Sequence, residues 1–89
     1  MNFEWDRAKE LANRRKHGVD FRAAAKVFLD PYAIELDDIG VADEERFNVI
    51  GLVDGRMLFV TCTLRGGTIR IISARGAQAR KKTVSRGLS

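Results

Sequence analysis

Apolar residues recur at helical spacing in the first third of the chain. They form two short stripes, Ala8, Leu11 and Ala12, then Phe21, Ala24, Ala25 and Phe28. Asp6 and Asp20 precede the stripes as expected N-caps, because an Asp carboxylate accepts a hydrogen bond from a backbone N–H of the first turn. Gly18 is a typical residue just past a helix end. We therefore expect one helix from about Arg7 to Lys16 and a second short helix that Asp30-Pro31 stops.

After Pro31 the apolar residues alternate with polar ones, as in β-strands. The expected strands are an edge strand around Tyr32 to Leu36, then Arg46 to Val53, Arg56 to Arg65 and Thr68 to Ser73. Asp54-Gly55 and Gly66-Gly67 separate the last three, and such pairs predict two-residue hairpin turns. The acidic stretch 37–45 is an expected loop. The pattern predicts an antiparallel sheet of about four strands and an α+β fold.

The two tight turns fix the expected register, with Val53 opposite Arg56 and Arg65 opposite Thr68. One face of the sheet is then core: Phe47, Val49, Gly51, Leu58, Val60, Cys62, Leu64, Ile69, Ile71 and Ser73. The opposite face has an apolar end: Ile50, Leu52, Met57, Phe59 and Ile72. Its other end is polar: Arg46, Asn48, Thr61, Thr63, Arg65, Thr68 and Arg70. Arg46, Thr63 and Arg70 should form one row across three strands.

Length, charge and cysteine content narrow the class of protein. Eighty-nine residues make a single domain, 1–89. Residues 65–89 carry seven bases and no acid, whereas residues 1–64 carry nine bases and twelve acids, which points to a polyanionic partner or, alternatively, to a solvated basic helix. The single cysteine excludes an internal disulfide, and we expect neither a metal site nor a cofactor. Without a signal or membrane segment, the cytoplasm is the expected location.

The predicted row of Arg46, Thr63 and Arg70 suggests a phosphate site. Like charges on neighbouring strands destabilise a sheet slightly unless an anion lies among them. Arginine binds phosphate through two parallel hydrogen bonds, and Arg65 and the Thr63 hydroxyl lie near enough to contribute. The alternative is that Asp43, Glu44 and Glu45 fold over the row and neutralise it.

The chain resembles the BrnT family of ribonuclease toxins from bacterial type II toxin–antitoxin systems. The resemblance rests on these residues: Phe3-Glu4-Trp5-Asp6, Asn13, Lys16-His17-Gly18-Val19, Phe21, Ala24, Val27-Phe28, Asp30-Pro31, Glu45-Arg46-Phe47, Ile50-Gly51 and Arg70-Ile71-Ile72-Ser73-Ala74-Arg75. It implies a compact fold similar to the RelE-like toxins and RNA cleavage that stops translation. It also implies a BrnA-like antitoxin with a ribbon-helix-helix domain, in a complex that binds its own operator DNA.

The C-terminal part is expected to form a short basic helix from Ala74, with Arg80, Lys81 and Lys82 contacting RNA. Here the chain departs from the family, whose members continue with another arginine, further bases, a glutamate and an aromatic residue. The corresponding positions are Gly76, Ala79, Lys81 and Ser85. The alternative function is therefore a catalytically weakened module that binds the antitoxin or acts as a co-repressor. A DNA-binding regulator is less favoured, because no helix-turn-helix pattern is present.

Metal-free RNA cleavage requires a base for the 2′-hydroxyl, cations for the phosphorane and an acid for the leaving oxygen. We assign phosphorane stabilisation to the arginines: Arg46, Arg65, Arg70 and Arg75. His17 is the chain's only histidine, the residue type whose unperturbed pKa suits acid–base exchange near neutrality, and Lys16 adjoins it, so both are candidates for proton transfer. Alternatively, His17 only caps the end of its helix. Glu4 and Trp5 are equally well explained as packing elements that hold the first helix to the sheet.

Overall fold

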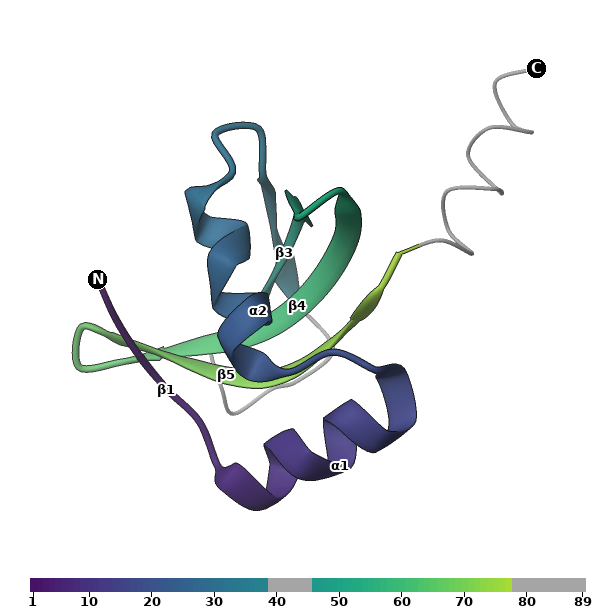
Figure 1. Cartoon of the computed structure of the whole chain (residues 1–89). Coiled ribbons are helices and arrows are strands. Elements are labelled where there is room, and N and C mark those ends of the chain that lie inside the picture. Colours follow the sequence, from purple (N-terminus) through teal and green to yellow (C-terminus); the bar gives the residue numbers. More distant parts are fainter. Residues whose placement is uncertain (39–45, 78–89) are drawn as a thin grey trace.

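The chain forms a five-stranded sheet with helical segments against it (Figure 1). This computed structural model describes residues 1–38 and 46–77. The elements in chain order are β1 (Asn2–Glu4), α1 (Arg7–His17), α2 (Phe21–Ala25), the 3-10 helix η1 (Lys26–Leu29), β2 (Ile34–Asp38), β3 (Arg46–Val53), β4 (Arg56–Arg65) and β5 (Thr68–Gly76). The fold class is α+β, as predicted.

The predicted N-terminal helices are confirmed, together with their caps. The carboxylate of Asp6 accepts a hydrogen bond from the backbone N–H of Lys9 at 3.1 Å, and α1 ends at Gly18, whose φ is 71°. The carboxylate of Asp20 caps α2 by accepting from the N–H of Ala23 at 2.7 Å. The second helix tightens into η1 before Asp30, so it is partly 3-10 rather than α-helical.

The predicted antiparallel sheet of about four strands is wrong, because the sheet has five strands and is mixed. Its order is β1-β5-β4-β3-β2, and β1 runs parallel to β5. The pairs are Asn2 with Thr68, Phe3 with Ile69 and Glu4 with Arg70. A strand of three residues is too short for its alternation to stand out in the sequence. β2 lies at the opposite edge, and its edge position was predicted correctly.

Both hairpin turns and the register between β3 and β4 agree with the prediction. Asp54 and Gly55 have φ values of 49° and 80°, and Gly66 and Gly67 have 56° and 83°. Positive φ at both positions is the requirement of a type I′ turn, whose twist matches that of the strands it joins. Arg46 therefore lies opposite Thr63, which in turn lies opposite Arg70.

A β-bulge changes the second half of β5 from the predicted register. Cys62 pairs with Ile71 but Thr61 pairs with Ser73, which leaves Ile72 as the extra residue. Ala74, and not Ser73, therefore lies opposite Val60 on the buried face. The strand continues to Gly76, so the predicted helix cannot begin at Ala74. Residues 78–89 of that prediction lie outside the described residues.

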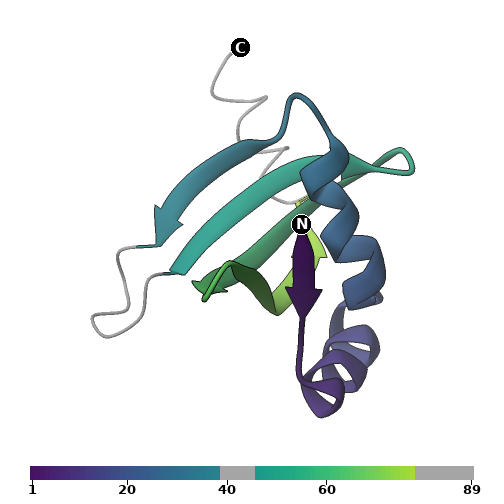
Figure 2. The ribbon, with the colours of Figure 1, turned by 90° about the vertical axis from the view of Figure 1, so that its left-hand side faces the viewer.

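The hydrophobic core lies between the helical segments and one face of the sheet. Phe21 and Val27, both fully buried, meet the sheet residues Val49, Val60 and Ile71. Figure 2 shows the helices gathered on one side of the curved sheet. The buried strand side chains of the described residues all lie on this side except Thr63, which is 5% exposed. We call the other side the open face.

No helix in residues 1–38 and 46–77 is long and apolar enough to cross a membrane.

Candidate functional site

Four polar residues stand in line on the open face of the sheet. Arg46 in β3 pairs with Thr63 in β4, Thr63 pairs with Arg70 in β5, and Arg70 pairs with Glu4 in β1. Neighbouring strands lie about 4.8 Å apart, so the row is short enough for one nucleotide to contact several members. We call Arg46, Thr63, Arg70 and Glu4 the charged row. The turn chemistry and the β1–β5 pairing place them together.

The guanidinium of Arg70 is paired with a carboxylate of the same chain. Its Nη1 atom lies 3.0 Å from Oε2 of Glu4, and the two side chains are 29% and 41% exposed. The acids expected to neutralise the row, Asp43, Glu44 and Glu45, lie outside the described residues. The described carboxylate that contacts Arg70 is Glu4, a residue that could equally have been a packing element on the sequence alone. The alternation of Asn2, Phe3 and Glu4 is too short to have predicted this contact.

The open face becomes less polar with increasing distance from the charged row. The next row holds Asn48 and Thr61, whose hydroxyl donates a hydrogen bond to the Asn48 side-chain oxygen at 2.8 Å. Beyond it Phe59 pairs with Arg75, whose guanidinium carbon lies 4.5 Å from the centre of the Phe59 ring. Four strand positions of about 3.3 Å each separate Phe59 from Thr63, or about 13 Å. Arg75 therefore does not join the charged row.

Arg65 lies at the opposite side of the charged row, at the tip of the β4–β5 hairpin. It follows Thr63 by two residues on the same face and pairs with Thr68. Arg65 is exposed. Two strand positions amount to about 7 Å, within reach of an arginine side chain. The structure thus brings Arg65 close to the charged row, as the predicted register required.

Lys16 and His17 lie at the far end of α1 from the charged row. α1 begins at Arg7, soon after Glu4, and runs along β5 to the level of Ala74, which Asn13 contacts. Lys16 and His17 follow Asn13 by about one turn, so they lie beside the C-terminal half of β5 rather than beside Arg70. The predicted RNA-binding residues Arg80, Lys81 and Lys82 lie outside the described residues.

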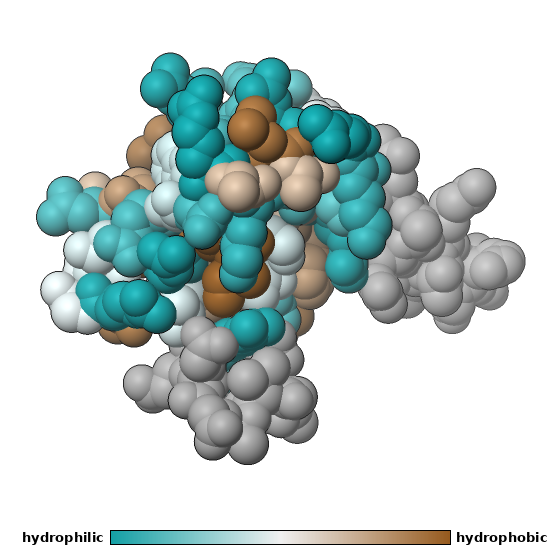
Figure 3. Space-filling model, turned by 90° about the horizontal axis from the view of Figure 1, so that it is seen from below, coloured by the Kyte–Doolittle hydropathy of each residue, from teal (hydrophilic) through white to brown (hydrophobic). Residues whose placement is uncertain are grey.

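Asn13 is the buried residue of α1 and holds the helix to the sheet. Its side-chain amide donates to the carbonyls of Val19 at 2.9 Å and Ala74 at 2.8 Å, and its oxygen accepts from the N–H of Ala74 at 3.2 Å. The rest of α1 is largely solvated, and the surface seen from below Figure 1 is mainly hydrophilic, with small separate hydrophobic patches (Figure 3). In the sequence, Asn13 stands out only as part of the family motif.

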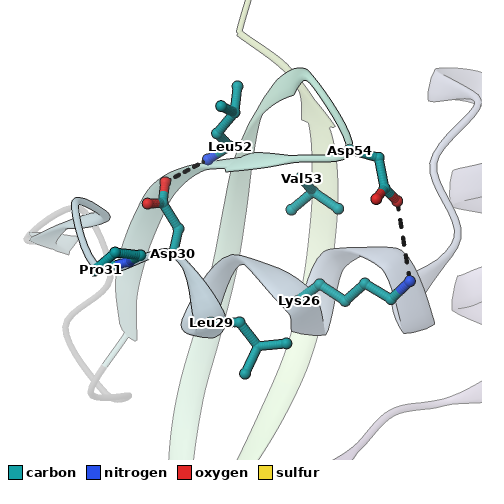
Figure 4. A pocket seen from close by; sticks show the side chains of 7 residues that line it. All are labelled: Lys26, Leu29, Asp30, Pro31, Leu52, Val53 and Asp54. Atoms are coloured by element: carbon teal, nitrogen blue, oxygen red, sulfur yellow. Dashed lines mark hydrogen bonds and ion pairs between the residues drawn. The ribbon is translucent and has the colours of Figure 1, made fainter.

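A groove of about 320 Å³ between η1 and the β3–β4 hairpin was not predicted (Figure 4). Its lining is Lys26, Leu29, Asp30, Pro31, Leu52, Val53 and Asp54. The carboxylate of Asp30 accepts hydrogen bonds from the N–H groups of Leu52 at 2.7 Å and Tyr32 at 2.9 Å, which hold its pKa below the usual value. Lys26 lies 3.9 Å from Asp54 across the groove. The hydrogen bonds of Asp30 and the ion pair of Lys26 with Asp54 connect η1 and the residues around it to the β3–β4 hairpin and stabilise the fold.

Two further features bear on the chemistry available to the described part of the chain. It contains no group of three or more His, Cys, Asp or Glu residues that could hold a metal ion. Burial raises the pKa of the Cys62 thiol to about 12, with a smaller contribution from the charge of Glu35. Because the nucleophile is the thiolate, Cys62 is inert at neutral pH.

Residues 5–81 of the chain match the family model described as "Ribonuclease toxin, BrnT, of type II toxin-antitoxin system". A comparison with curated proteins found no match.

Proposed function

Since this chain belongs to the BrnT family, the ribonuclease toxins of type II toxin–antitoxin systems, we propose that its charged row binds the RNA backbone at the bond that is cleaved. The observation that supports this most directly is the alignment of Arg46, Thr63 and Arg70 on adjacent strands. Guanidinium groups fit phosphate oxygens through paired hydrogen bonds, and Thr63, which is 5% exposed, lies between the two arginines in the row.

The ion pair between Arg70 and Glu4 is compatible with phosphate binding. Both side chains are partly exposed, at 29% and 41%. Ion pairs in contact with water contribute only about 0–1 kcal/mol to stability. A phosphate group can therefore compete with Glu4 for Arg70 at low cost.

We propose that cleavage needs no metal ion and proceeds through an anionic phosphorane. Arg46, Arg65 and Arg70 stabilise its charge, because donors placed where charge develops lower the barrier more than donors that bind the ground state. Arg75 lies further along β5, and Lys16 and His17 in α1 lie beside that part of the strand, so we assign all three to neighbouring parts of the same RNA strand. Proton transfer by His17 would require the scissile bond to lie near the end of α1.

The charged row is tested by RNA cleavage with Arg70→Ala, Arg46→Ala and Thr63→Val. Loss of one preorganised donor typically lowers kcat by roughly 100- to 1000-fold, and we expect Arg70→Ala to lie in this range. Arg22→Ala, an exposed arginine of α2, is the matched control and should cleave like wild type. Wild type should retain its activity in EDTA.

Full activity of folded Arg70→Ala and Arg46→Ala would contradict the assignment of the row. Folding is checked by circular dichroism and urea unfolding, so a loss of structure is distinguished from a loss of chemistry.

We further propose that the antitoxin is BrnA-like, with a ribbon-helix-helix domain, and that the complex binds its own operator DNA. The toxin on its own would act in the cytoplasm, where RNA cleavage stops translation. Membership of a type II system implies that the antitoxin is a protein and supports this pairing. The adjacent reading frame should encode the partner, and co-expression should relieve growth arrest.

The second candidate function is a weakened toxin that binds its antitoxin or acts as a co-repressor. The contact between Arg70 and Glu4 favours it, because that guanidinium already has an anionic partner. Antitoxin binding without RNA cleavage or growth arrest would support this alternative.

A further inference from the structure

The charged row ends in a carboxylate, and its chemistry differs from that of the other three members. We propose that Glu4 is the general base that takes the proton from the attacking 2′-hydroxyl of the RNA. This inference rests on the proposed function, since it assigns a role within the same site. Glu4 belongs to the Phe3-Glu4-Trp5-Asp6 segment that resembles the family, and it directly precedes the matched residues 5–81.

Aromatic packing on both sides of Glu4 fixes its position. Phe3 packs against Phe28, with ring centres 5.3 Å apart, and pairs with Ile69 of β5. Trp5 packs edge-on against Phe21, with ring centres 6.1 Å apart. Because side chains alternate along a strand, anchoring Phe3 on the core side directs Glu4 to the open face.

Glu4 has the surroundings that a general base at a phosphate site needs. Its Oε2 atom lies 3.0 Å from Nη1 of Arg70, so the arginine proposed to bind the phosphate also holds the carboxylate beside it. Its side chain is 41% exposed, so a substrate hydroxyl can reach the carboxylate from solvent. A phosphate bound by Arg70 would place the adjoining ribose next to Glu4, because the two residues are direct neighbours across β1 and β5.

Three other described groups with acid–base chemistry have less suitable surroundings. Both oxygens of Asp30 accept backbone hydrogen bonds at the distant groove. Cys62 is fully buried in the core. His17 lies beside the other half of β5, about one turn beyond Asn13.

The proposed step is a transesterification within the RNA. Glu4 accepts the 2′-hydroxyl proton while the 2′-oxygen forms a bond to phosphorus. The bond from phosphorus to the 5′-oxygen breaks, and that oxygen takes a proton from water. The products are a 2′,3′-cyclic phosphate and a 5′-hydroxyl, and Glu4 returns its proton to solvent. No electrons are transferred to or from the protein.

The test is the pH dependence of single-turnover RNA cleavage by wild type, Glu4→Gln and Glu4→Ala. General base catalysis typically contributes 100- to 10,000-fold, so we expect Glu4→Gln to lose roughly that factor. The wild-type rate should fall at acid pH as the carboxylate protonates, and this acid limb should be absent in Glu4→Gln. Formate or acetate should partly restore the rate of Glu4→Ala. Glu35→Gln, an exposed glutamate of β2, is the matched control and should retain both rate and acid limb.

The outcomes separate the inference from the proposed function. If wild type cleaves and Glu4→Gln keeps its rate, Glu4 is not the base, although the row can still bind RNA. If Glu4→Gln is slower but keeps the acid limb, Glu4 only positions Arg70, and the inference is equally overturned. RNA affinity and urea unfolding of each variant show whether the protein remains folded and binds substrate. A wild-type protein that binds RNA without cutting it would overturn both proposals.

Discussion

Asn13 shows how one side chain can take the place of a neighbouring strand. β1 accompanies β5 only as far as Arg70, which leaves the next part of that edge without a strand. There the Asn13 amide exchanges two hydrogen bonds with the backbone of Ala74, at 2.8 and 3.2 Å. This is the bonding that a paired strand would provide. The third bond, to the carbonyl of Val19, ties the turn after α1 to the same point.

Asn13→Ala should lower the free energy of unfolding by about 2–3 kcal/mol, measured by urea denaturation. Asn13 is only 7% exposed, so its removal leaves buried backbone groups of Ala74 and Val19 without partners, at about 1–3 kcal/mol for each unsatisfied group. Water that enters the vacated space would offset part of this cost. Arg15→Ala, an exposed position on the same helix, should change stability by less than about 0.5 kcal/mol. Equal stabilities of the two variants would show that the Asn13 bonds contribute nothing.

At the scale of elements, Asp30 connects the end of η1 to β3. One carboxylate oxygen accepts from the N–H of Leu52 and the other from the N–H of Tyr32. Gly51 makes this close approach possible, because an added Cβ would lie 3.2 Å from the Ala33 side chain and 3.3 Å from the carbonyl of Val27. The connection between η1 and the sheet therefore depends on the Asp30 carboxylate and on glycine, which has no side chain, at position 51.

Asp30→Ala should be less stable than wild type at pH 7, and the difference should shrink in acid. The hydrogen bonds from Leu52 and Tyr32 lower the pKa of Asp30 from its ordinary value of 3.8. A lowered pKa in the folded state contributes stability that is present above the ordinary pKa and is lost as the pH falls through the folded value. Urea unfolding at pH 7 and near pH 3 measures this change. A difference in stability that stays constant with pH would contradict the charge effect.

The sequence predicted those elements whose signals are local. Asp6 and Asp20 gave the helix starts, and the two glycine-containing turns gave the register on which the row of Arg46, Thr63 and Arg70 depends. The bulge at Ile72 was missed, because nothing in the alternation of β5 shows an added residue before the partner strand is known. β1 was missed because its partner is at the other end of the sequence.

At the scale of the whole molecule, Cys62 should report global unfolding. Its side chain is fully buried, and burial raises its pKa to about 12, so the folded protein offers a thiol reagent almost no thiolate. We expect labelling by a disulfide reagent to be at least about 1000-fold slower than in the unfolded chain and to rise with urea in step with unfolding. Fast labelling without denaturant would show that the core opens locally.

Only the part of the candidate site that lies in the β3–β4 and β4–β5 hairpins could be predicted from the sequence. Arg46, Thr63, Arg65 and Arg70 occupy three consecutive strands, so turn geometry alone brought them together. Glu4 could not be added, because no local pattern indicates that it meets Arg70. The spacing of Lys16 and His17 from the row likewise depends on how α1 lies along β5.

The parallel pairing of β1 with β5 also determines at which stage of folding the charged row forms. Glu4 and Arg70 are 66 residues apart in the sequence, so their contact belongs to the most non-local and slowest class of folding events. While the β4–β5 hairpin is still inside the ribosome, Glu4 is already outside it but Arg70 is not. The charged row can therefore assemble only after β5 has been synthesised and β1 has paired with it.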